Sequence, residues 1–402
     1  MWEQIRSNQI RSVVLTMVMG ALLILIGYFL GLYFGSAIAG LIIALLVWAV
    51  LSLVAYFQGD SILLSMSGAK KISRDDHPRL YNVVEEMKIA SGLEKMPDIY
   101  IIDDPALNAF ATGRDPNRAS VAITSGLLQK LNRDELQGVI GHEISHIKNR
   151  DVLLMAMCSI LLGTIVLLAW YGSRFLIFGG TGSRRSSSSG GGGGALIIIL
   201  VVALVFMILA PIMAQLIYFA ISRKREYLAD ASSALYTRYP EGLASALEKL
   251  GTSTGQLKSA NQATSPMYIV NPFRKKGMQA SDLTSTHPPL SKRIRILRAM
   301  AGASFNDYDQ AYRQVYQGGK GIIPGAGLAA GTVPIATIKL EGEAGELNEI
   351  QRARETSDVM WRLSNYNTIT CDCGAKLRVP PQFKEPQIKC PHCGRTHPVP
   401  RT

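Results

Sequence analysis

The stretch Val139–Asp151, VIGHEISHIKNRD, carries two histidines four positions apart, with a glutamate directly after the first. On a helix, residues i and i+4 share a face, so His142 and His146 can bind one metal ion together. Imidazole suits zinc, and a catalytic zinc site typically has three protein ligands and water. Glu143 lies about 100° further round the helix, where it can act as a base toward the zinc-bound water. The stretch predicts amide hydrolysis; an exposed helix with two solvated histidines is the alternative.

A third zinc ligand is expected from RKREYLADASS, residues 223–233, which follows an apolar stretch. The motif helix is expected to run into another apolar stretch, and two spans joined by a short loop are antiparallel neighbours. Their polar ends then meet, which brings Glu226 to the two histidines. Asp230, one helical turn after Glu226, is expected to accept a hydrogen bond from a ligating histidine and so fix its tautomer.

The apolar residues are concentrated in a few long stretches. The chain has 402 residues, of which 48% are hydrophobic and 18% charged, and none is charged from Ser12 to Gly59. That stretch can hold two membrane spans with a turn near Gly31–Ser36. Uncharged stretches at 152–171 and 195–221 predict a third and a fourth transmembrane helix. A buried core helix is the alternative for one such stretch, but the presence of four stretches of this length disfavours that alternative.

The net charge of +12 is expected on one side of the membrane, because Lys and Arg are absent from the first predicted turn and scarce in the loop between the last two spans. The positive-inside rule places both termini and both polar segments in the cytoplasm, with the chain as a multi-pass protein of the cell (inner) membrane. The lipid bilayer is therefore an expected partner. No nucleic acid is expected, since no basic patch is interleaved with base-stacking aromatics.

The fold class expected is an α+β integral membrane protein with four transmembrane helices, a mostly helical hydrolase domain with a small β-sheet, and a C-terminal zinc ribbon. The expected parts are a transmembrane hairpin (1–59), a metallopeptidase domain that includes the last two spans (60–316), a Gly-, Ala- and Pro-rich linker (317–345), and a helix with the ribbon (346–402). Helices are expected at 78–93, from Asn132 through the motif, and near 241–250; strands are expected at 97–104, 106–113 and 119–126.

The chain resembles the HtpX-type membrane metallopeptidases, a group that also holds the CAAX prenyl endopeptidases. The resemblance rests on GHEISHIKNRD and REYLADASSAL, and on LNAFATG (107–113), ITSGLLQKL (123–131) and THPPLSKRI (286–294), and covers about residues 1–300. It implies a gluzincin fold, one catalytic zinc ion, and cleavage of membrane or misfolded proteins at the cytoplasmic side.

The resemblance also implies roles for individual residues. Three zinc ligands and a general base are implied: His142, His146, Glu226 and Glu143. Asn108 matches a position on the edge strand beside the cleft, where an extended peptide could bind by β-addition. His287 matches a histidine near the zinc that could donate a hydrogen bond to the developing oxyanion. Arg293 matches an arginine that would orient Glu226, the substrate or the oxyanion. A purely structural or surface role is the alternative for the last three.

Four of the five cysteines cluster in CDCG (371–374) and CPHCG (390–394). Thiols on the cytoplasmic side stay reduced, so metal binding is favoured over disulfides. Four thiolates make a closed tetrahedral site, and the glycine after each pair permits a tight turn. A structural zinc ion is therefore expected at Cys371, Cys373, Cys390 and Cys393. A redox pair, or ligation by His392 or His397, is the alternative, and the ribbon is expected to bind a protein partner.

The expected function is a zinc-dependent endopeptidase of the cytoplasmic membrane face, which cleaves misfolded or membrane proteins through a zinc-bound water activated by Glu143. Two zinc ions per chain are expected, one catalytic and one structural. A CAAX-type prenyl-protein endopeptidase is the alternative among enzymes. A membrane adaptor with an inert peptidase domain and a partner-binding ribbon is the alternative outside them, although an inert relic would not need a base at Glu143.

Overall fold

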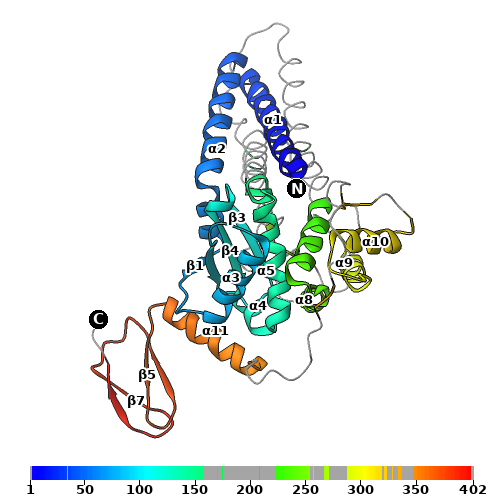
Figure 1. The fold of residues 1–402 in the computed structure, drawn as a ribbon. Helices are drawn as coiled ribbons and strands as arrows, with labels where there is room; N and C mark the ends of the chain where they lie inside the picture. The colour runs from blue at the N-terminus through cyan, green and yellow to red at the C-terminus, as the bar shows by residue number, and fades with distance from the viewer. Residues whose placement is uncertain are drawn as a thin grey trace.

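The computed structural model describes residues 2–33, 35–156, 170, 174, 208, 223–253, 257, 267–270, 288–318, 321–323, 328, 334–336 and 347–399. A long helical hairpin rises from a mixed α/β body, and the C-terminal helix and ribbon lie at the end of that body farthest from the hairpin tip (Figure 1). The predicted linker, 317–345, falls mostly outside the described residues.

The hairpin consists of α1 (Trp2–Tyr33) and α2 (Ala37–Met66), which pack against each other. Ser36 caps α2 by accepting a hydrogen bond from the Ala39 amide at 3.3 Å, so the turn lies where the sequence predicts it. Within the part of the chain that the structure describes, α2 alone is long and apolar enough to cross a membrane, with a mean hydropathy of 2.8. It also continues past residue 59, the predicted end of the hairpin.

The third and fourth predicted spans, 152–171 and 195–221, lie mostly outside the described residues and stay predictions. The expected continuity between the motif helix and the third span is wrong. Helix α5 (Arg133–Lys148) ends before that span, and Asn149 and Arg150 form a turn in which Arg150 adopts φ 58°. A separate helical segment then begins at residue 151. A single residue in the left-handed region interrupts the helix, and spacing alone does not reveal it.

A four-stranded sheet with strand order β1–β2–β4–β3 lies in the body. Its strands are β1 (Ala69–Ile72), β2 (Asp98–Ile102), β3 (Ala109–Gly113) and β4 (Ala119–Thr124). The β2–β4 pair is parallel, and the β1–β2 and β3–β4 pairs are antiparallel. The last three strands confirm the predicted ones, whereas the short, lysine-containing β1 has no apolar alternation that would predict it. Because β3 is at the sheet edge, one side of its backbone faces away from β4.

Helices cover the sheet and fix the motif. The helix α3 (Pro78–Ser91) packs against α5, and α5 also contacts β3 and α8 (Pro240–Thr252). Asn132 caps α5 in the expected capping box with Glu135. Gly138 allows the close approach of α8, since a Cβ there would lie 2.6 Å from the backbone nitrogen of Leu243. The motif helix is therefore held from several sides rather than lying on the surface.

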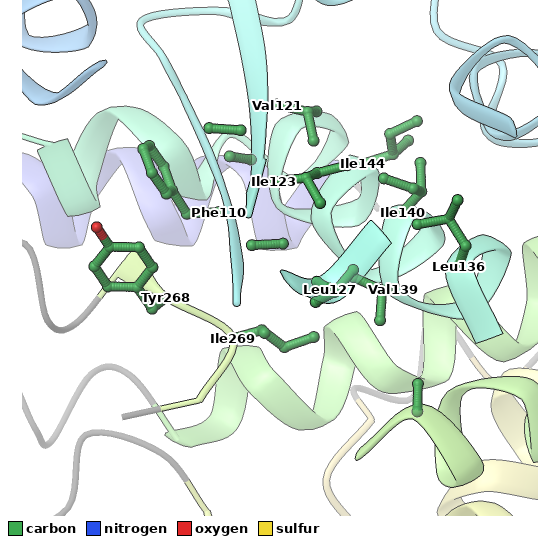
Figure 2. Packing of buried hydrophobic residues seen from close by; sticks show 14 of the residues in the cluster. Phe110, Val121, Ile123, Leu127, Leu136, Val139, Ile140, Ile144, Tyr268 and Ile269 are labelled. Carbon is green, nitrogen blue, oxygen red and sulfur yellow. The ribbon is translucent and has the colours of Figure 1, made fainter. Parts of the chain in front are cut away.

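The hydrophobic core fills the space between the sheet and α5 (Figure 2). Its fully buried side chains include Val121 and Ile123 from β4 and Val139, Ile140 and Ile144 from α5. Apolar residues thus surround the two motif histidines along the helix. This burial argues against the alternative of an exposed helix with solvated histidines.

The C-terminal part begins with α11 (Glu349–Leu363), which packs against α4 (Ser125–Lys130) and confirms the predicted polar helix. Two antiparallel hairpins follow: β5 (Asn367–Thr370) with β6 (Lys376–Val379), and β7 (Gln387–Lys389) with β8 (Thr396–Pro398). Arg378 and Lys376 from β6 form ion pairs with Asp358 of α11, at 2.9 and 2.5 Å. These contacts connect the ribbon to the helix that is docked on the body. The remaining helices are α9 (Leu290–Arg298) and α10 (Phe305–Val315).

Candidate metal centre

The structure brings together the three side chains that the sequence predicts as catalytic zinc ligands. His142 and His146 share one face of α5, and their Nε2 atoms lie 3.3 Å apart. Residues 223–237 are helical and carry Glu226 against this face. Its Oε2 lies 3.5 Å from Nε2 of His142, and its Oε1 lies 3.6 Å from Nε2 of His146. All three residues are at most 3% exposed.

This donor set fits zinc. One ligand atom from each residue lies within 4.8 Å of the others. Two nitrogen ligands of a tetrahedral zinc ion, each about 2.05 Å from it, would stand about 3.3 Å apart. The observed separation of the two Nε2 atoms matches that value. Two imidazoles with one carboxylate also leave the fourth position that a catalytic zinc site requires.

Asp230 lies behind His142. Its Oδ1 is 3.0 Å from Nδ1 of His142, whereas Nε2 of the same ring faces His146 and Glu226. A carboxylate there holds the proton on Nδ1, orients the ring and keeps Nε2 available as a ligand. The predicted neighbourhood of Asp230 and a motif histidine is therefore present in the structure.

Asp151 does the same for His146, and the sequence reasoning missed it. Its Oδ2 lies 3.2 Å from Nδ1 of His146, and both side chains are buried. In an unbroken helix, a residue five positions later points about 140° away. The turn at Arg150 changes this direction and brings the carboxylate back to the ring. The available signal was an acidic residue at the end of the motif, but only the broken helix gives it a role.

Arg293, from α9, connects the outer carboxylates to the ligand set. Its Nε and Nη2 donate to the two oxygens of Asp230 at 2.8 and 2.6 Å, and its Nη1 lies 3.6 Å from Oε2 of Glu226. The side chain is 0% exposed. Of the three roles that the resemblance implies for it, orientation of Glu226 is the one that these contacts favour.

The charges of the site are set by burial and by close partners. Burial alone would lower the pKa of His142, but its hydrogen bonds with Asp230 and Glu226 raise that pKa to about 9. A metal ion bound at Nε2 would take the place of the second proton of the ring. Burial raises the pKa of Asp230, yet Arg293 and His142 outweigh this and leave the pKa below its ordinary value. Asp230 is therefore a fixed negative charge behind the ring.

Glu143 is 1% exposed, and burial raises the pKa of its carboxyl, with the two motif histidines offsetting this only in part. Its Oε2 makes no hydrogen bond to any residue that the structure describes. A buried carboxylate oxygen without a partner is suited to accept a proton from a molecule that enters the site.

Asn108 lies just before the edge strand β3 and is 3% exposed. Its Nδ2 donates to the Val270 carbonyl at 2.9 Å, and its Oδ1 accepts from the Val270 amide at 3.4 Å. In the structure, the side chain therefore contacts the chain's own backbone, and its role in substrate binding stays a prediction. His287, the other predicted substrate-side residue, lies outside the described residues.

The four C-terminal cysteines form a second cluster. The Sγ atoms of Cys371 and Cys393 are 3.4 Å apart, and those of Cys373 and Cys390 are 3.7 Å apart. Zinc–sulfur bonds of about 2.3 Å in a tetrahedron give sulfur separations of about 3.8 Å, so the cluster fits zinc. Gly374 and Gly394 follow the two pairs with φ of 83° and 76°, the left-handed turns that glycine permits. The shorter first pair therefore still makes an equivalent turn.

The chain matches one family model, several named relatives and a solved structure. The model of peptidase family M48 matches residues 74–301. The protease HtpX homolog of Dictyoglomus turgidum is 44% identical over 299 residues, which cover 74% of this chain and 94% of the relative. The protease HtpX homolog of Streptococcus pneumoniae is 44% identical over 301 residues, 75% of this chain and 100% of the relative. The crystal structure of S. mikatae Ste24p aligns with 20% identity and a TM-score of 0.40, covering 73% of this chain and 66% of that one. The family match includes the predicted catalytic ligands and ends before the ribbon.

Proposed function

The chain belongs to peptidase family M48, and on that premise we propose that His142, His146 and Glu226 hold the zinc ion of a membrane endopeptidase. The observation that carries the proposal is the convergence of these three buried side chains, with Asp230 and Asp151 behind the two rings. When bound, zinc supplies polarisation of water and of the substrate carbonyl. The residues of the chain hold the ligand atoms at fixed positions and exclude bulk water.

Glu143 is proposed as the general base. Its buried Oε2 can take a proton from the attacking water, and the raised pKa of the carboxyl makes that proton transfer easier near neutral pH. The same oxygen can then give the proton to the leaving amine of the substrate. Hydrolysis of a peptide bond thus needs one carboxyl group that both accepts and donates.

Two further residues are proposed to assist. Arg293 is a positioning residue, because its contacts with Asp230 and Glu226 fix the direction of a ligand and of the carboxylate behind His142. His287 is proposed, on sequence grounds alone, to donate a hydrogen bond to the oxyanion that develops on the substrate carbonyl.

The cellular setting is proposed from the charge pattern and the apolar helix α2. The chain is a multi-pass protein of the inner membrane, with four spans, and both termini and the active site face the cytoplasm. Its substrates are misfolded or membrane proteins, which gives it a role in protein quality control. The ribbon holds a structural zinc ion at its four cysteines and binds a substrate or a regulatory protein.

Cleavage of casein by the purified full chain in detergent tests the proposal. Wild type, Glu143→Gln and the control Glu85→Gln, whose side chain is partly exposed on α3, are compared with and without added zinc. We expect zinc-dependent cleavage by wild type and control, and a loss of about 10²–10⁴-fold in kcat for Glu143→Gln at unchanged zinc content. Casein is unprenylated, so its cleavage also argues against a strict prenyl-protein specificity. Zinc-loaded wild type without any activity would instead favour the adaptor.

A further inference from the structure

The segment Met267–Val270 is buried against the outer edge of β3. Its four residues are between 1% and 8% exposed. The Ile269 amide donates to the Ala109 carbonyl of β3 at 3.0 Å. This carbonyl points away from β4, because the neighbouring Asn108 is the residue whose backbone bonds to Thr124 at the end of β4. A segment of the chain itself therefore hydrogen-bonds to the free edge of the sheet.

Both backbone groups of Ile269 and both of Val270 are hydrogen-bonded. The Ile269 carbonyl accepts from Nη1 of Arg293 at 3.3 Å. The Val270 amide and carbonyl bond to the side-chain amide of Asn108, at 3.4 and 2.9 Å. Together with the bond to Ala109, these contacts give a partner to every backbone N–H and C=O group of the two residues.

These partners are the groups that a substrate needs. A peptide that adds to a sheet edge binds by its backbone N–H and C=O groups, and affinity comes from those main-chain hydrogen bonds. Here the Ala109 carbonyl at the sheet edge and the side-chain amide of Asn108 already bind the segment. The Arg293 guanidinium, which also binds the segment, contacts Glu226. The segment thus shares the partner Arg293 with the candidate ligand Glu226, and its backbone uses the hydrogen-bonding groups that a bound peptide would use.

We propose that Ile269 and Val270 occupy the peptide-backbone site of the enzyme as a built-in competitor that a substrate must displace. The inference rests on the proposed peptidase function and concerns the regulation of the same site. A substrate that forms the same hydrogen bonds replaces the segment at little net cost in hydrogen bonding. Since only chains with the segment released can bind substrate, the apparent KM rises by the inverse of the released fraction, while kcat stays the same.

The grip on the segment includes contacts outside the peptide site. The Tyr268 hydroxyl lies 3.4 Å from Oγ of Ser67, the residue that ends α2, and the Tyr268 ring packs edge-on against Phe110 with centroids 5.2 Å apart (Figure 2). Ile269 belongs to the same hydrophobic cluster as Val139 of the motif helix (Figure 2). The membrane hairpin therefore helps to hold the segment, and release would open an apolar space that an aliphatic substrate residue could fill.

The first experiment weakens this grip without touching the candidate metal ligands, Asn108 or Arg293. Tyr268→Phe and Ser67→Ala each remove the same hydroxyl contact. Ser364→Ala is the matched control, because it removes a side-chain hydroxyl contact with Nζ of Lys70, at 3.0 Å, between α11 and β1. The kcat and KM for casein are measured on the full zinc-loaded chain in detergent, with thermal unfolding as the check of folding.

We expect both segment variants to lower KM by about twofold to tenfold, the effect of one net hydrogen bond, with kcat unchanged and Ser364→Ala like wild type. A wild type that is silent while Tyr268→Phe cuts casein would support the proposal further. If wild type cuts and the folded segment variants show an unchanged or raised KM, the segment is only a structural support and the inference is wrong. If no variant cuts with zinc bound, the proposed function fails, and the inference fails with it.

A second measurement uses the segment as a free peptide. Ac-Met-Tyr-Ile-Val-Asn-NH2 should inhibit casein cleavage competitively, and more strongly for Tyr268→Phe than for wild type, because the site is released more often. The control Ac-Met-Tyr-Asp-Val-Asn-NH2 should not inhibit, since a carboxylate would have to enter the apolar cluster that Ile269 fills. Equal inhibition by both peptides, or by neither, would contradict the assignment of the segment to the peptide site.

Discussion

The Arg293 guanidinium and the Asp230 carboxylate form a two-point ion pair that is completely buried, with N–O distances of 2.8 and 2.6 Å. The same carboxylate lies 3.0 Å from Nδ1 of His142. One arginine thus neutralises the charge that orients a zinc ligand. Without it, Asp230 would lose the strongest of the charges that lower its pKa against the effect of burial.

Arg293→Met should therefore destabilise the protein strongly. Removal of one partner of a buried ion pair costs about 3–5 kcal/mol, because the other charge stays buried and uncompensated. Arg298→Met is the control, since Arg298 lies on the same helix but pairs with Glu241 and Glu248 at the surface, where such pairs contribute about 0–1 kcal/mol. Thermal unfolding of the two variants checks this. Equal losses in both would show that the buried pair is not the reason.

Asp151→Asn should weaken zinc binding about 10–100-fold, because the carboxylate behind His146 orients the ring and increases its basicity. Asp103→Asn, at an exposed position after β2, is the control. Competition with a fluorescent chelator measures the affinity of the catalytic site, and the cysteine site serves as an internal reference within each chain. A zinc affinity equal to that of the control would show that Asp151 does not support zinc binding through His146.

Elemental analysis of the purified chain should give two zinc ions. Cys390→Ser with Cys393→Ser should remove one and leave zinc-dependent cleavage of casein measurable, because the two ligand sets are made by separate parts of the chain. His142→Ala should remove the other and leave the ribbon zinc. A single ion that the cysteine substitutions do not affect would contradict the structural zinc.

Acid should destabilise the protein through His77. This buried side chain caps α3 by accepting at Nδ1 from the Leu80 amide, 3.3 Å away. Burial first, then the charge of Arg79, lowers the pKa of His77 to about 4. Nδ1 of His77 also lies 3.7 Å from Oε1 of Glu355 on α11, and burial raises the pKa of that carboxyl. The positive charge of Arg362, on the same helix as Glu355, further lowers the pKa of His77.

The sign follows from the two states. The unfolded chain protonates His77 near its ordinary value of about 6.5, whereas the folded chain stays neutral until about pH 4, so stability falls as the pH drops between those values. From pH 7 to pH 5 the loss should be about 2 kcal/mol. His77→Asn keeps an acceptor at the helix cap and should reduce this loss. Thermal unfolding at both pH values measures it, and an unchanged pH dependence in the variant would assign the effect to other groups.

Spacing within the sequence determined the parts of the site that local geometry controls. His142 and His146 share a face because a helix repeats every 3.6 residues, and Asn132 with Glu135 starts that helix in a capping box. Charge and hydropathy likewise indicated α2, and the cysteine spacing indicated the second cluster. Each of these features depends on residues that are neighbours along the chain.

Tertiary structure alone decided which distant groups complete the site. The left-handed Arg150 ends α5 and turns Asp151 toward His146, although nothing in the residue types requires a break there. Arg293 reaches the metal ligand Glu226 from another helix, and Ile269 of the segment Met267–Val270 reaches Ala109 of β3 from a distant part of the chain. Such contacts depend on how helices and strands pack together, and the sequence pattern records the period of each element but not its neighbours.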